Sequence, residues 1–223
     1  MIYTRLASAI YNDVVAGLRG YSSVPSLSLE QLEDDIIDER LKIIKEFTLN
    51  GIIPRKDLML SIRCVKVDCQ SLDRCCVTSD NDQPIAHFEI PQILVDYGID
   101  SIDYIGATDM KLPFIWYTNV NTWNSHKYRK RGKKKPYVFI DVTPNGNNMY
   151  DGYIFNAPMI KQLTITAIFK DPRQLADYNC CNNEDIDNFS FVHNEIKRRL
   201  TEKKLRYYRQ FAPSPVINDQ VAR

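Results

Sequence analysis

The hydrophobic period of the chain changes twice, and these changes constrain its fold more than any single motif. Apolar residues first recur every three or four positions, then alternate with polar residues after Pro54, and regain the helical period after Asp171. A helical period places apolar side chains on one stripe of a helix, whereas alternation places them on one face of a strand. The sequence therefore predicts an α+β fold, in which a helical layer from N- and C-terminal helices carries an inserted, mostly antiparallel β-sheet domain.

Two helices are expected near the N-terminus. The first runs over roughly Tyr3–Arg19, and a short polar link leads to the second, which begins after Ser28 and ends before Gly51. Ser28 followed by Gln31 is typical of a capping box, and Gly51 suits the left-handed residue that follows many helices. The short link predicts an antiparallel helical hairpin. The second helix has an acidic face, formed by Glu30, Glu33, Asp34, Asp35, Asp38 and Glu39.

Segments of the central region are rich in β-branched and aromatic residues, which favour strands. The expected strands are Leu58–Cys64, Ile85–Ile90, Ile102–Ala107, Pro113–Thr118, Tyr137–Val142, Gly152–Asn156 and Leu163–Phe169. The Asn145-Gly146 pair predicts a hairpin between the two strands that flank it, because Asn and Gly tolerate the positive φ angles of a reversing turn. We also expect Ile102–Ala107 to pair with Pro113–Thr118 through the turn between them.

Helical signals return at Asp171, an N-capping residue followed by Pro172 at the first helical position. They predict a short helix to Tyr178 and a last helix over about Phe191–Phe211, followed by an aperiodic end that contains prolines. The chain thus divides into an N-terminal helical hairpin (1–51), an inserted β-rich domain (52–170), C-terminal helices that pack with 1–51 (171–211) and an extended C-terminal arm (212–223).

One loop of the β-rich domain is strongly basic. Its seven cations within nine positions are Lys127, Arg129, Lys130, Arg131, Lys133, Lys134 and Lys135. No matching set of carboxylates lies nearby in the sequence, so this loop must meet water, a polyanion or an acidic protein face. Trp116, Trp123 and Tyr128 are close by in the sequence, which suits phosphate contact with stacking. The formal charge of the whole chain is only +1, so a solvated loop is the other interpretation.

Cysteine and histidine spacing gives a weak case for a metal site. The candidates for a zinc site are Cys64, Cys69, Cys75, Cys76 and His87. Zinc fingers and ribbons need two closely spaced ligand pairs, which this pattern does not provide. Reduced thiols are therefore the favoured interpretation, with zinc and a disulfide as alternatives, and we expect no metal and no cofactor. Because the chain has no apolar run long enough for a secretion signal or a membrane span, synthesis inside the cell is expected.

No residue pattern points to catalysis. The histidines of the chain are His87, His126 and His193. None stands in a recognisable signature with a nucleophile. Asp103, Asp109 and Lys111 are candidates for a metal-dependent nuclease site, but the last two fall in an expected turn, where Asp is favoured for backbone reasons alone. We therefore predict a protein that is not an enzyme.

Several segments carry a resemblance to a known family. They are Leu18–Tyr21, Leu29–Asp34, Asp103–Gly106, Lys134–Asp141, Ile154–Pro158 and Ile168–Leu175. These segments resemble a family of virion structural proteins from crAss-like bacteriophages, over about Tyr3–Cys181. The layout of terminal helices around an inserted sheet is also similar to the head-to-tail adaptor proteins, also called ring or connector proteins, of short-tailed phages. No catalytic residue comes with either resemblance.

The resemblance implies a homo-oligomeric ring subunit at the head-to-tail junction of a virion. Such a ring, expected to be twelvefold, has the portal protein above it and further ring, tail or muzzle proteins below it. It lines or surrounds the passage used in genome ejection, where non-specific contact with packaged DNA is an open alternative. The protein is then made in the host cytoplasm, ends in the virion and contacts no membrane.

A closed ring requires two different, complementary surfaces on each copy. The acidic second helix and the basic last helix are candidates for such a pair, and the extended arm is expected to order on a neighbour or on the portal. The expected subunit or portal contacts are Arg198, Arg199, Lys203, Arg206, Tyr208, Phe211, Pro213, Pro215, Val216 and Ile217. The competing hypothesis is a DNA-binding or nuclease accessory protein that uses the basic loop.

Overall fold

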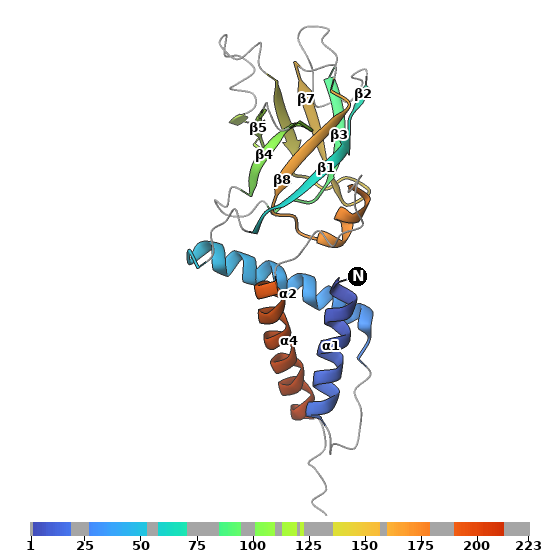
Figure 1. Cartoon of the computed structure of the whole chain (residues 1–223), viewed down its shortest axis with the longest axis vertical. Helices are drawn as coiled ribbons and strands as arrows, with labels where there is room; N and C mark the ends of the chain where they lie inside the picture. The colour runs from blue at the N-terminus through green and yellow to red at the C-terminus, as the bar shows by residue number, and fades with distance from the viewer. Residues whose placement is uncertain are drawn as a thin grey trace, which may run out of the picture. The chain divides into compact units, whose positions relative to one another are not determined.

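The chain has the expected α+β architecture, with helices from both ends and a sheet region inserted between them (Figure 1). The computed structural model describes residues 2–18, 27–52, 58–70, 85–94, 101–109, 113–119, 121–122, 136–156, 160–178 and 190–211. It divides into two compact units. The helical unit comprises residues 1–53 and 187–223, and the β unit comprises residues 54–186. The sequence had placed 171–186 with the terminal helices, whereas in the structure these residues belong to the β unit.

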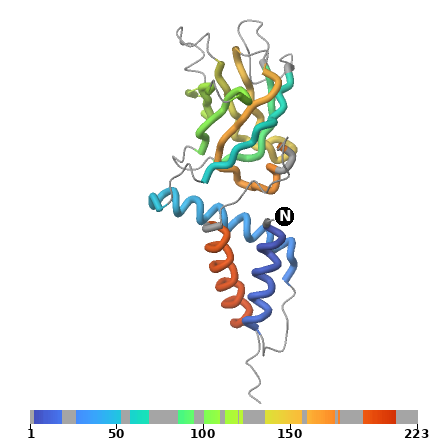
Figure 2. Tube along the Cα trace, in the orientation of Figure 1, coloured from blue at the N-terminus to red at the C-terminus, as the bar shows by residue number. Residues whose placement is uncertain are grey.

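The helical unit contains α1 (Ile2–Gly17), α2 (Leu29–Leu49) and α4 (Ser190–Phe211), and each helix contacts the other two. Figures 1 and 2 show α1 and α4 side by side with α2 running across them, rather than the antiparallel α1–α2 hairpin expected from the short link. Helices α1 and α4 are parallel. Tyr3 contacts His193 near their starts, and Gly17 lies against Leu205 near their ends.

Apolar stripes on the three helices form the core of this unit. Its fully buried side chains include Ala7, Ile10, Val14, Leu32, Ile36, Ile43, Ile44, Val192, Ile196 and Leu200. Because each helix has only one such stripe, burying all three stripes against one another satisfies the hydrophobic requirement of every helix. Among the described residues, no helix is long and apolar enough to span a bilayer.

The two ends of α2 differ in how far local sequence determines them. Gly51 has a φ of +63°, and the amides of Gly51 and Ile52 donate to the carbonyls of Thr48 and Phe47. This pattern is a Schellman motif, so the expected glycine stop is confirmed. Ser28 has the extended backbone of an N-cap, but its side chain makes no capping hydrogen bond, so the predicted capping box is wrong.

The β unit contains two sheets in its described part. Their strands are β1 (Leu60–Lys66), β2 (Asp68–Gln70), β3 (Ile85–Pro91), β4 (Ile102–Ala107), β5 (Ile115–Tyr117), β6 (Tyr137–Asp141), β7 (Met149–Phe155) and β8 (Gln162–Ala167). One sheet has the order β1-β8-β4 and the other the order β2-β3-β7-β6-β5. All pairs within these sheets are antiparallel except β5 and β6, which are parallel.

The two sheets continue into each other. Val67 alone separates β1 from β2, so one extended segment passes from the first sheet to the second. Beyond β3, Ile93 bridges to Phe169, and Gly106 of β4 bridges to Pro113 just before β5. Segments that switch sheets at corners are typical of barrel-like sandwiches. On the larger sheet, Phe139, Tyr153 and Phe155 form a cluster of buried side chains against which Tyr117 and Tyr137 pack. The expected pairing of Ile102–Ala107 with Pro113–Thr118 holds only next to the turn, where Gly106 bridges to Pro113 and the Phe114 amide donates to the Ile105 carbonyl at 2.7 Å. Further along, β4 pairs with β8, and β5 pairs with β6.

The predicted β6–β7 hairpin is confirmed, but its turn works differently from the expectation. The positive φ of 60° falls on Asn148, whereas Gly146 has no positive φ. Asn145 instead organises the turn: its side-chain Oδ1 accepts hydrogen bonds from the amides of Asn147 and Met149, both at 3.0 Å. Its Nδ2 donates to Glu89 on β3 at 3.0 Å, which ties the turn to the neighbouring strand.

Glycine is required at one position in the centre of the larger sheet. Gly152 on β7 lies directly opposite Phe88 on β3, and a Cβ atom there would stand 2.2 Å from the Phe88 Cζ atom. Since Phe88 is fully buried, its ring has no solvent-exposed space into which to move.

A short 3-10 helix, η2 (Pro172–Tyr178), follows β8 and packs against β1. The carboxylate of Asp171 accepts the Arg173 amide at 2.9 Å, so the predicted N-cap is confirmed.

Candidate interaction surface on the helical unit

Helix α4 carries the strongest concentration of positive charge among the described elements. Its cations from the second turn onward are Lys197, Arg198, Arg199, Lys203, Lys204, Arg206 and Arg209. An exposed ion pair contributes only about 0–1 kcal/mol, so a cation without a carboxylate partner in its own chain is the more readily available to another molecule. The ion pairs of these cations within the chain therefore decide which part of α4 can bind another molecule.

Arg199 is held inside the helical unit. Its guanidinium donates to Glu46 of α2 at 2.8 Å and to Glu195 of α4 at 2.7 Å, and it lies 3.8 Å from Glu39. The hydrogen bond from Arg199 lowers the pKa of Glu46. Arg199 was expected to contact another subunit, but in this geometry it joins α4 to α2 of its own chain.

Glu195 anchors the first cations of α4. Arg198 donates to it at 2.7 Å and also reaches Glu202 at 3.1 Å, while Arg199 approaches from the other side. Hydrogen bonds from Arg198 and then Arg199 hold the pKa of Glu195 at about 2, well below its usual value. A carboxylate with two guanidinium partners remains ionised through the range of ordinary buffers.

Two further cations pair with carboxylates of other helices. Lys197 lies 2.9 Å from Asp13 of α1, and Lys204 lies 2.5 Å from Asp35 of α2. Arg209 donates to the backbone oxygen of Gly17 at 3.4 Å. Helix α1 has no basic residue in its last turn, so Arg209 supplies the positive charge that favours a helix C-terminus.

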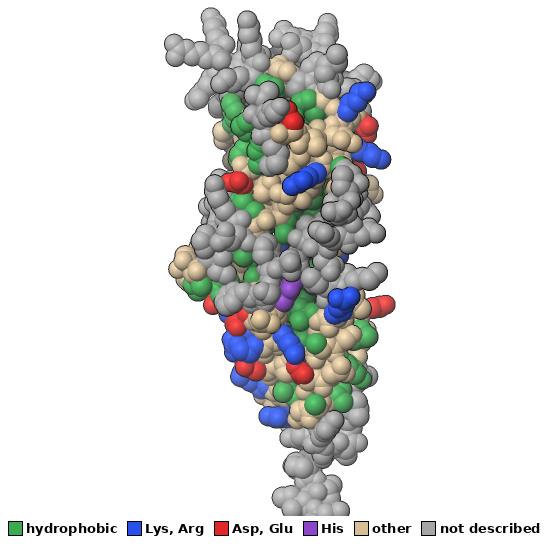
Figure 3. All heavy atoms as spheres, in the orientation of Figure 1, with side chains coloured by type: hydrophobic (Ala, Val, Ile, Leu, Met, Phe, Trp, Pro, Cys, Tyr) green, Lys and Arg blue, Asp and Glu red, His purple; other side chains and the backbone are tan. Residues whose placement is uncertain are grey.

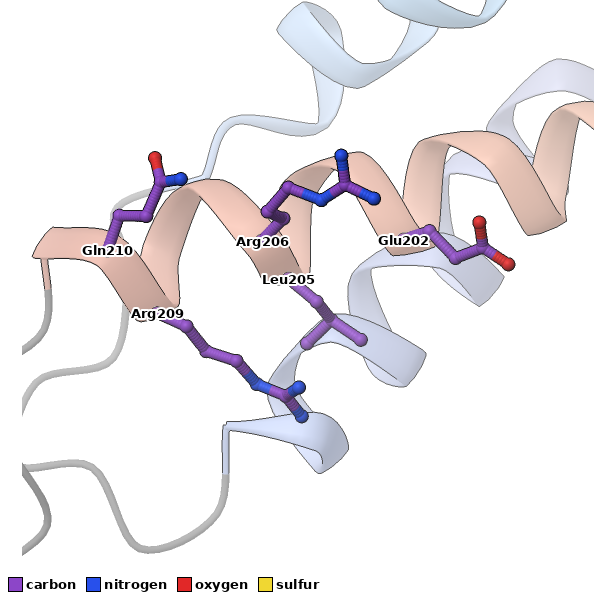
Figure 4. A pocket seen from close by; sticks show the side chains of 5 residues that line it. All are labelled: Glu202, Leu205, Arg206, Arg209 and Gln210. Atoms are coloured by element: carbon purple, nitrogen blue, oxygen red, sulfur yellow. The ribbon is translucent and has the colours of Figure 1, made fainter.

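The charge left over lies in the C-terminal half of α4. Lys203 and Arg206 are exposed and make no ion pair with any described residue. Beside them lies a pocket of about 460 Å³, lined by Glu202, Leu205, Arg206, Arg209 and Gln210 (Figure 4). These residues come from the last three turns of α4. In Figure 4, Leu205 and Arg209 point toward α1, and Arg206 and Gln210 point the other way.

The start of α2 has the opposite character. Glu30, Glu33 and Asp38 have no ion pair with a described residue, in contrast to Asp35, Glu39 and Glu46. Leu29, at the first position of α2, is 43% exposed. The helical unit thus has an acidic helix start with an exposed leucine and a basic helix end with a pocket. Figure 3 shows positive and negative side chains close together on this unit, so its surface is mixed in sign.

The remaining expected contact residues fall into two groups. Tyr208 is half-buried and its ring meets that of Tyr207 edge-on. Phe211 is the last residue of α4. The basic loop at 127–135 and the arm residues Pro213, Pro215, Val216 and Ile217 lie outside the described residues.

The zinc candidates are differently engaged in the structure. Cys64 is disulfide-bonded, so the expectation of reduced thiols is wrong for this residue, and its sulfur is not a thiolate ligand. His87 is buried and its Nε2 lies 2.7 Å from Asp151 Oδ1. The side chains of Cys69, Cys75 and Cys76 lie outside the described residues. No three metal-ligating side chains in the described part of the chain form a group that would hold an ion.

Two of the three nuclease candidates lie in described parts of the β unit. Asp103 lies on β4, Asp109 lies in the turn that follows, and Lys111 is outside the described residues. Burial, followed by the Asp109 charge, raises the pKa of Tyr104.

Sequence reasoning missed a polar network on the larger sheet. Asp151 on β7 is directly opposite Glu89 on β3 and Asp141 on β6. His87 bonds to Asp151, and Asn145 bonds to Glu89. The alternation of His87 and Glu89 placed both on one face, but no sequence signal indicated the partner strand. Comparison of the chain with protein-family models and with curated proteins finds no match.

Proposed function

We propose that the protein is a non-enzymatic structural subunit that forms a closed ring at the head-to-tail junction of a phage particle. The observation that carries this proposal is the helical unit: helices from both chain ends pack together and leave charges of opposite sign unpaired at two different places. The family resemblance of the sequence supports the same role. The ring joins the portal to the tail proteins and surrounds the DNA passage.

A ring subunit needs two unlike surfaces that fit each other, because one contact is repeated until the ring closes. The acidic start of α2 and the basic end of α4 meet this requirement in charge. Surface charges of this kind contribute more to the choice and orientation of a partner than to affinity. The inserted β unit is then available for contact with the layer above or below.

The proposal is tested in purified particles. Cross-linking followed by mass spectrometry is expected to join this chain to the portal protein and to itself. The number of copies of the chain in each particle is expected to equal the number of positions in the ring. A protein that is abundant in infected cells but absent from washed particles contradicts the proposal.

The competing DNA-binding function has its own measurement. It predicts tight binding of duplex DNA whose affinity falls steeply with salt, because neutralised phosphates release counterions. Changing Lys133, Lys134 and Lys135 to Ser would then flatten that salt dependence. Weak binding with an unchanged slope favours the structural role.

A further inference from the structure

We propose that the first turn of α2 of one copy docks on the α4 pocket of a second copy, through Leu29 and Glu30. This inference rests on the proposed function, since it names the contact by which copies join. The occupant is a second copy because the same chain supplies both halves of the contact.

The pocket offers three kinds of group to an incoming helix start. Leu205 provides apolar surface, Arg206 and Arg209 provide guanidinium groups, and Gln210 provides an amide. A suitable occupant therefore has an apolar side chain next to carboxylates. Arg206 has no ion-pair partner among the described residues of its own chain, so its charge is available to that occupant.

The start of α2 matches this description. Leu29 is 43% exposed, Glu30 follows it in the first turn of the helix, and Glu33 lies about one turn further on. In the described residues neither carboxylate pairs with a cation. The acidic residues of α2 that pair with α4, namely Asp35, Glu39 and Glu46, already have lysine and arginine partners within the chain.

The distribution of ion pairs along α4 also explains why the contact lies at the C-terminal end of this helix. Toward the start of α4, Lys197 forms an ion pair with Asp13 and Arg199 forms one with Glu46. Toward its end, Lys203 and Arg206 are not paired by any described carboxylate. A partner that follows electrostatic complementarity is thus directed to the C-terminal half.

The test uses two charge reversals in the full chain, Arg206→Glu and Glu30→Arg. Self-association is measured by sedimentation velocity over a range of protein concentration and salt. Each variant alone is expected to associate about tenfold more weakly, because attraction becomes repulsion at a desolvated contact. An equimolar mixture is expected to regain wild-type association, since the reversed surfaces then fit each other. Leu29→Ser is also expected to weaken association. Mixing this variant with a charge-reversal variant is not expected to restore it.

Arg5→Glu is the matched control, because Arg5 is an exposed arginine of the same unit and the charge change is identical. This control is expected to associate like the wild type. All variants should unfold at the wild-type temperature. A marked fall for Arg206→Glu would show that the arginine acts within its own chain, which would overturn the docking contact.

Three other outcomes also overturn it. The two reversals could associate like the wild type, which leaves the ring proposal standing but removes this contact. The mixture could fail to restore association. Arg206→Glu could abolish binding of a 24-base-pair duplex while Glu30→Arg leaves association unchanged, which identifies the pocket as a phosphate site. A wild-type chain that stays monomeric at every concentration contradicts the ring proposal itself.

Discussion

Replacing Gly152 by Ala is expected to destabilise the β unit, although Gly-to-Ala changes in regular structure are often favourable. The new Cβ would lie 2.2, 2.4 and 2.6 Å from three ring atoms of Phe88, whereas ordinary contacts begin at 3.4 Å. The ring must therefore retreat by about 1.2 Å within a close-packed core. Overpacking of this kind costs about 1–3 kcal/mol, against a gain of about 0.5–1 kcal/mol from the less flexible unfolded chain. We expect a net loss of about 2 kcal/mol.

Urea unfolding followed by tryptophan fluorescence measures this loss selectively, because both tryptophans, Trp116 and Trp123, fall within residues 54–186. Gly146→Ala is the matched control, since a Cβ at Gly146 meets nothing within 4 Å, and it should leave the midpoint unchanged. Phe88→Leu shortens the opposing side chain and should reduce the cost of Gly152→Ala by about 1 kcal/mol in a double-mutant cycle. An unchanged midpoint for Gly152→Ala, or strictly additive costs in the cycle, would refute the steric account.

Three further predictions concern single residues. The helical unit should lose stability as pH falls from about 4.5 to 2, because the folded pKa of Glu195 is about 2 and lies below its ordinary value of 4.5; far-ultraviolet circular dichroism that stays flat over this window contradicts it. Asn145→Ala should destabilise the β unit by about 1–2 kcal/mol, because two turn amides lose their acceptor, and fluorescence-monitored unfolding at the wild-type midpoint argues against that role. Gly17→Ala should not lower the unfolding temperature of the helical unit, because its Cβ would meet the Cδ atoms of Leu205, which can move at little cost, while alanine favours a helix over glycine by about 0.5–1 kcal/mol; a fall that Leu205→Ala removes would contradict this.

The sequence was most informative where structure depends on neighbouring residues. Gly51 determines the end of α2, Asp171 begins the 3-10 helix, and the Asn145-Gly146 pair between two β-rich segments correctly indicated a hairpin. Turn details were less accessible, because either Asn145 or Gly146 could have taken the strained position and the structure gives that role to Asn148.

The pairing of strands that are far apart in the sequence could not be predicted from the sequence. Strand β8 pairs with both β1 and β4, and Leu60 and Ile102 both meet Ala167, although these residues are far apart in sequence. A period of two identifies a strand but does not name its neighbour, so the sequence favoured the nearest partner for β4.

Ion pairs between residues far apart in the sequence were equally unpredictable at the candidate site. The acidic and basic helices were expected to complement each other between subunits, but Arg199 and Glu46, 153 positions apart, are partners within one chain. Only the three-dimensional arrangement shows which cations of α4 have no carboxylate partner among the described residues. It narrows the candidate surface from the whole of α4 to Lys203, Arg206 and the pocket.

The mass of the purified wild-type chain in solution tests the central claim most directly. Native mass spectrometry at moderate salt is predicted to show one closed assembly, with a mass of about 310 kDa for twelve copies of the 25.9 kDa chain. A closed ring of another number would change the symmetry and keep the claim. A monomer at every concentration, or a dimer that does not grow, would contradict it.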